Sequence, residues 1–144
     1  MIVIPTIVST PDGIFMEVEP VSVFDVTDLN AWKRHVVKAL ENGNAIVTPD
    51  DSTNEPGSAV LERLGLKKWH DFEVNAVMFT IHKGAMYFTI YSTGRDEKRM
   101  WTKSGLERKF ASQAPVSMVV DELANDLVKE PEAFPRSSTL LLGG

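Results

Sequence analysis

Three histidines are the residues in this chain that could most readily act as acids, bases or metal ligands near neutral pH. They are His35, His70 and His82. A zinc site without cysteine needs imidazoles or carboxylates that converge from several elements. The chain has no His-x-x-x-His or His-Glu-x-x-His spacing, so we expect no metal site.

Each histidine also has a simpler interpretation. His70 is followed by Asp71, a pair that occurs in metal-binding helical phosphohydrolases, but here it leads directly into a predicted β-hairpin and is read as a surface histidine. His82 could serve as a general base, although no nucleophile can be placed beside it from the spacing. His35 falls in an amphipathic helix, where packing or solvation accounts for it. Phosphate loops and nucleophile elbows are absent from the sequence. We therefore expect no catalytic residues, no cofactor and no enzymatic activity.

Charge favours a basic partner. The 144 residues carry a net charge of -5, which attracts basic proteins and on average repels nucleic acid. A polar segment after the first predicted helix holds a group of acidic and amide side chains without the alternating ligands of a calcium loop. We predict that this group contacts the partner, with Glu17 and Glu19 as a second candidate; a solvated turn is the alternative. The group consists of Asp50, Asp51, Asn54 and Glu55.

A basic stretch points to a different function class. Residues 95–109 contain six basic and three acidic residues and enclose Trp101. Basic residues around an aromatic ring can bind single-stranded nucleic acid by phosphate pairing and stacking. The alternative function is therefore a small nucleic-acid-binding or processing domain, and the competing interpretation is a solvated loop. The basic residues are Arg95, Lys98, Arg99, Lys103, Arg108 and Lys109.

The elements that must position these residues indicate a single α+β domain over residues 1–144, with a mainly antiparallel sheet. Alternating apolar residues predict hairpins at about residues 2–19 and 75–93. In the second hairpin, a turn at Lys83 and Gly84 would pair Phe79 with Phe88. Pro5 in the first strand predicts an edge strand at best, because proline cannot donate a ladder hydrogen bond.

Helical spacing of apolar residues predicts helices at about residues 28–42, 58–65 and 115–129, with Thr27 and Ser58 as N-caps. Residues 45–48 read as a short buried strand. The run from Met100 is either a short strand or a loop. From about residue 132 we expect a tail that is flexible or adds an edge strand.

The chain has no cysteine, no basic N-terminal region before an apolar run, and no apolar stretch near the length of a membrane span. These features predict a cytoplasmic protein that does not enter the membrane.

One stretch carries a family resemblance. It reads Leu64-Gly65-Leu66-Lys67-Lys68-Trp69-His70-Asp71-Phe72 and is followed by an alternating hairpin and an amphipathic helix. This arrangement resembles the immunity proteins of bacterial contact-dependent growth inhibition systems. The element order matches over about residues 58–129, and the letters match only in the short stretch.

The resemblance implies a small cytoplasmic protein, expected to be monomeric, that performs no catalysis. It would bind and neutralise the C-terminal toxin domain, commonly a nuclease, of a cognate effector. Interface residues vary within the family, so the resemblance assigns none here. We expect the stretch itself to serve packing, through Leu64, Leu66, Trp69 and Phe72.

Overall fold

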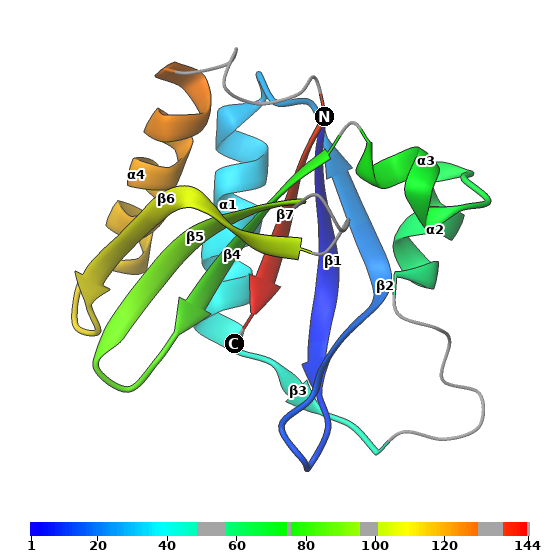
Figure 1. The fold of residues 1–144 in the computed structure, drawn as a ribbon. Helices are drawn as coiled ribbons and strands as arrows, with labels where there is room; N and C mark the ends of the chain where they lie inside the picture. Colours follow the sequence, from blue (N-terminus) through cyan, green and yellow to red (C-terminus); the bar gives the residue numbers. More distant parts are fainter. Residues whose placement is uncertain (49–56, 75, 96–100, 130–136, 144) are drawn as a thin grey trace.

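The computed structural model describes residues 1–48, 57–74, 76–95, 101–129 and 137–143. Within them, the elements run β1 (Ile2–Ser9), β2 (Phe15–Phe24), α1 (Leu29–Asn42), β3 (Ala45–Ile46), α2 (Ser58–Leu64), α3 (Trp69–Glu73), β4 (Ala76–Lys83), β5 (Tyr87–Arg95), β6 (Trp101–Ala111), α4 (Val116–Lys129) and β7 (Ser137–Gly143). This is the predicted α+β domain (Figure 1).

The described strands form one sheet in the order β2-β1-β7-β4-β5-β6, with β3 paired to β1 (Figure 1). Antiparallel pairs join β1 to β2 and β4 to β5, as the predicted hairpins require, and a further antiparallel pair joins β5 to β6. The strand β7 lies between β1 and β4 and is parallel to both. The predicted tail therefore contains a central strand, and the expectation of an edge strand there is wrong.

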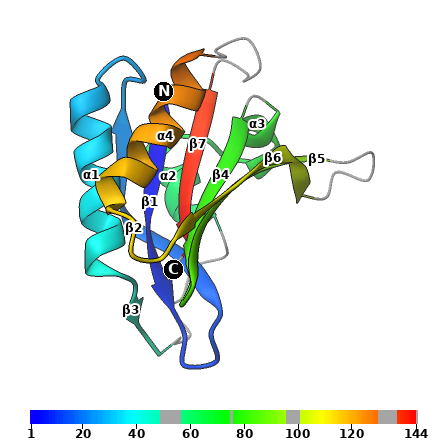
Figure 2. The ribbon, with the colours of Figure 1, turned by 90° about the vertical axis from the view of Figure 1, so that its left-hand side faces the viewer.

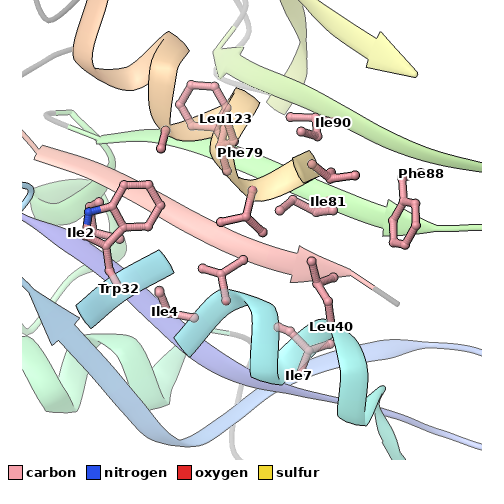
Figure 3. Close-up of a cluster of buried hydrophobic side chains, with 14 residues drawn as sticks. Ile2, Ile4, Ile7, Trp32, Leu40, Phe79, Ile81, Phe88, Ile90 and Leu123 are labelled. Atoms are coloured by element: carbon pink, nitrogen blue, oxygen red, sulfur yellow. The ribbon is translucent and has the colours of Figure 1, made fainter. Parts of the chain in front are cut away.

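Helices cover both faces of the sheet (Figure 2). On one face, α1 and α4 enclose a core that includes Ile2, Ile4 and Phe79 (Figure 3). On the other face, α2 and α3 pack over Val3 and Val21. Neighbouring residues of β1 thus enter different cores, because strand side chains alternate between the two faces.

The apolar residues that were predicted to line one side of α1 and of α4 form the main core. In α1, the buried residues are Trp32, Val36 and Leu40, at the expected spacing, whereas Leu29 is partly exposed. The Trp32 indole N–H donates to the carbonyl of Val26 over 3.2 Å, so its polar atom is satisfied inside the core. From α4, the same core receives Val119, Val120 and Leu123, all fully buried.

The predicted edge position of β1 is wrong, since β1 lies between β2 and β7. The β1–β2 ladder shifts register between Pro5 and Thr6, and this irregularity accommodates a residue that cannot donate a ladder hydrogen bond. Ile7 joins Ile2 and Ile4 in the core under α1, so the side-chain alternation of β1 also shifts between Ile4 and Ile7.

The second hairpin forms, but its predicted register is wrong. Ile81 pairs with Ile90 and Lys83 with Phe88. The Gly84 N–H donates to the Tyr87 carbonyl over 2.9 Å, which places the two-residue turn at Ala85 and Met86. The actual and predicted registers differ by an even number of residues, so Phe79, Ile81, Phe88 and Ile90 face the core in both. Met86, which the predicted register pairs with Ile81 on the core side, is instead 70% exposed in the turn. Hydrophobic alternation cannot distinguish between two such registers.

Both predicted N-caps are one residue off. The Thr27 hydroxyl donates to Asp25 over 2.6 Å, so Asp28 caps α1 instead and accepts from the Ala31 N–H over 3.4 Å. At α2 the N-cap is Gly57, which enters the helix at φ 81°, a conformation that glycine adopts without steric cost. Ser58 is already the first helical residue.

Two further strands differ from the sequence interpretation. The short strand β3 was predicted to be buried, yet both of its residues are exposed because it pairs with β1 alone, beyond the end of α1 (Figure 1). The run from Trp101, left open as a strand or a loop, is the long strand β6, which pairs with β5.

Candidate binding site

The predicted partner-binding residues Asp50, Asp51, Asn54 and Glu55 lie in the gap 49–56, outside the described residues. The chain on both sides of that gap contacts the β1–β2 hairpin. Before it, the Val47 N–H donates to the Ser9 carbonyl over 2.8 Å. After it, the Gly57 N–H donates to the carboxylate of Glu17. The described residues on the two sides of the gap, Val47 and Gly57, therefore both lie beside this hairpin.

Large apolar side chains are exposed at the turn end of the hairpin. Ile14 is 60% exposed, Phe15 48% and Ile46 73%. Phe15 and Ile46 both pair with Ser9, from opposite sides, so they flank one residue on one face of the sheet. We call Ile14, Phe15 and Ile46 the hairpin-end surface; it lies at the lower end of the molecule in Figure 1, at the β1–β2 turn and β3.

Beside this surface is a pocket of about 550 Å³. Its walls are the C-terminal half of α1, the part of β1 around the register shift, Phe15 of β2 and Lys83 of β4. The shift allows consecutive residues, including Thr6 and Ile7, to line one hollow. Among the described residues, its ionisable lining consists of His35, Lys38 and Lys83, without a carboxylate. The described lining therefore carries positive charge, although the protein as a whole is acidic.

His35 lies on the wall of the pocket that α1 forms. Its ring lies 5.3 Å from the ring of Phe24, at an interplanar angle of 55°. Burial, with a further contribution from the positive charge of Lys38, lowers the pKa of His35 below its usual value. The imidazole is thus neutral at neutral pH and can accept or donate a hydrogen bond.

The two lysines of the pocket are not neutralised by carboxylates of the described residues. The Nζ atom of Lys83 lies 5.8 Å from the centre of the Phe88 ring, an aromatic contact that leaves its charge in place. Lys33, five residues before Lys38 on α1 and outside the pocket lining, is by contrast paired with Asp121 of α4.

The structure places the three histidines on different elements. The Nδ1 atom of His70 lies 3.4 Å from Oε1 of Glu73 in α3, and His82 is exposed on β4. Across the described ranges, no three histidine or carboxylate side chains come close enough to hold a metal ion. His70 is exposed, as the sequence indicates, but it lies within α3 and not beside a helix.

The basic stretch falls on β5, β6 and the undescribed residues 96–100. Arg108 lies 3.6 Å from Glu122 of α4, and Lys109 lies 3.9 Å from Glu107. These two cations therefore face carboxylates, and the first pair joins the sheet to α4.

Glu17 and Glu19, the second candidate for contact with the partner, differ in exposure. Glu17 is half-buried and its pKa is raised by desolvation, whereas Glu19 is exposed.

No protein-family model, curated protein or solved structure matches this chain. In the part of the chain that the structure describes, every helix is too short or too polar to cross a bilayer.

Sequence reasoning missed both the hairpin-end surface and the pocket. The pocket draws its cations from α1 and β4, which are neighbours in space only after the sheet forms. The available signal was the spacing of His35 and Lys38, which puts both on one face of a helix.

Proposed function

We propose that the protein is an immunity protein, which binds the C-terminal toxin domain of a cognate contact-dependent growth inhibition effector in the cytoplasm and keeps it inactive. The toxin domain is proposed to be a nuclease. The contact is formed by Asp50, Asp51, Asn54 and Glu55 together with the hairpin-end surface.

The observation that carries this proposal is the position of the exposed apolar side chains. Ile14, Phe15 and Ile46 gather where the acidic segment leaves and rejoins the described fold. Protein interfaces commonly combine an apolar centre, enriched in aromatic residues, with a polar rim. In the proposed complex, Phe15 and Ile46 form the apolar centre and the acidic side chains of residues 50–55 contribute to the polar rim.

The net charge of -5 supports a basic partner. Nucleases carry positive charge where they hold the phosphates of their substrate. An acidic protein is steered to that surface and competes there with nucleic acid. Inhibition then requires only that the bound protein occupy the substrate groove, with no reaction step.

The stretch that carries the family resemblance has the packing role expected of it. Phe72 is buried, and Leu64, Leu66 and Trp69 pack around it in the second core. The Trp69 and Phe72 rings lie 4.9 Å apart. These residues pack against the face of the sheet opposite α1. We therefore assign them to the core and not to the toxin contact.

The proposal predicts that an effector with a toxic C-terminal domain is encoded beside this protein, and that domain is the partner for the test. Isothermal titration calorimetry should give a one-to-one complex that weakens as salt is raised. Asp50→Lys, Asp51→Lys and Glu55→Lys combined should weaken it at least about tenfold, since charge pairs at an interface contribute to affinity. Ile14→Ser with Ile46→Ser should have a similar effect.

The control is Glu62→Lys with Asp71→Lys and Glu107→Lys, which changes net charge equally at exposed positions on α2, α3 and β6. This variant should keep most of the affinity. Absence of a complex with the wild-type protein would refute the function. Wild-type affinity in both test variants would refute the contact surface while leaving the function standing.

A further inference from the structure

The pocket between α1 and β1 is a second site, next to the hairpin-end surface. At about 550 Å³ it falls within the range of pockets that bind small organic molecules, which is roughly 300–1,000 Å³. The two sites share only Phe15, because neither Ile14 nor Ile46 lines the pocket. Ligand binding in the pocket can therefore be tested separately from toxin binding.

The charge of the lining residues indicates which sign of charge a ligand should carry. Lys38 of α1 and Lys83 of β4 contribute two positive charges, and none of the described aspartates or glutamates lines the pocket. The C-terminal end of α1 at Asn42 and Gly43 opposes this with the negative end of its dipole, worth roughly half a unit charge. The two full charges outweigh that contribution, so the net field favours an anion.

The remaining lining supplies apolar contact and hydrogen bonds. Ile7 and Leu40 are apolar and nearly fully buried, and Phe15 presents a partly exposed ring. Ser9 and Asn42 also line the pocket, and a hydroxyl or an amide group can donate to an oxygen. Neutral His35 adds one more hydrogen-bonding group at the wall.

We propose that this pocket binds a small organic anion, a molecule with one carboxylate, sulfonate or phosphate group attached to an apolar body. The anionic group lies between Lys38 and Lys83, and the apolar body lies against Ile7, Leu40 and Phe15. An aromatic body suits the partly exposed Phe15 ring, because offset aromatic rings attract each other.

Two fluorescent probes of nearly the same shape test this assignment. Anilinonaphthalene sulfonate carries the anionic group, and phenylnaphthylamine has the same aromatic skeleton without it. The wild-type protein should bind the sulfonate at least several-fold more tightly. Lys38→Gln with Lys83→Gln should weaken sulfonate binding by about tenfold, the expected effect of removing two partly solvated charge interactions. Binding of the uncharged probe should not change.

Lys67→Gln with Lys68→Gln is the matched control, since both lysines are exposed between α2 and α3 and the charge change is identical. It should bind both probes as the wild type does. Chemical shifts of His35 and Ala39 should move when the sulfonate is added to the wild-type protein. The proposal fails if the wild type does not bind the sulfonate, if both double variants lose it equally, or if neither does.

Discussion

Glu17 and His35 are both partly buried, and burial disfavours the charged form of each side chain. The pKa of Glu17 is therefore raised, although the Gly57 N–H partly offsets the desolvation. The pKa of His35 is lowered, and the nearby charge of Lys38 acts in the same direction. Both residues border the two candidate sites, so each site adjoins a group whose protonation is coupled to folding.

Glu17→Gln should stabilise the protein at neutral pH. Between the ordinary value of 4.5 and the raised pKa, the folded state binds more protons than the unfolded state, so wild-type stability falls as pH rises through that window. A glutamine has no charge to bury, and its amide oxygen can still accept from the Gly57 N–H. Urea unfolding should show an advantage for the variant at about pH 7 that disappears below about pH 4.5.

The control for this prediction is Glu19→Gln, two residues along the same strand and exposed. It should follow the wild-type stability at every pH. A Glu17→Gln variant whose advantage does not depend on pH would mean that the charge of Glu17 is not the cause.

At the scale of the element, amphipathic spacing predicted α1, α2 and α4 to within a residue or two. That success is expected, because each of these helices buries a stripe set by the helical period itself. The caps were less predictable, since Thr27 and Asp28 can both cap a helix and only the bond from Thr27 to Asp25 decides between them. The hairpin register failed for a related reason, because two registers satisfied the same pattern.

Gly57→Ala should destabilise the protein more than Gly65→Ala. Both glycines lie at ends of α2 with positive φ, 81° and 67°, and an alanine there costs about 1 kcal/mol. A Cβ at Gly57 would come within 2.7 Å of the Trp69 ring, whereas nothing lies within 4 Å at Gly65. We expect a loss of about 2–3 kcal/mol for Gly57→Ala, since displacing a packed ring adds overpacking strain.

Chemical denaturation of the two variants measures this difference, and Gly65→Ala isolates the backbone contribution. Equal losses would show that Trp69 moves away at no cost and does not fix the entry to α2.

At the scale of the whole molecule, the fold class could be predicted but the strand order could not. Local patterns identify hairpins because hairpin partners are neighbours in sequence. The strand β7 instead joins β1 and β4, which lie more than 50 residues before it, and a parallel partner leaves no local signal. The pocket depends on the same long-range arrangement, so the sequence could indicate only its α1 side, through the spacing of His35 and Lys38.

A chain that ends before Ser137 should fail to fold. Removal of β7 separates β1 from β4 in the centre of the sheet and exposes two unpaired strand edges. Circular dichroism should show no cooperative thermal transition for this truncation. A chain that lacks only Gly144 is the control and should melt as the full chain does. A truncated protein with wild-type unfolding would show that the segment after residue 132 is a dispensable tail.

The most direct measurement of the proposed function is growth of cells that express the toxin domain of the effector that the proposal predicts to be encoded beside this protein. Co-expression of this protein should restore growth, and the variant with Asp50, Asp51 and Glu55 all changed to lysine should restore it poorly. The Glu62, Asp71 and Glu107 charge-reversal control should protect as well as the wild type. Continued growth arrest in the presence of soluble wild-type protein would contradict the proposed role as an inhibitor.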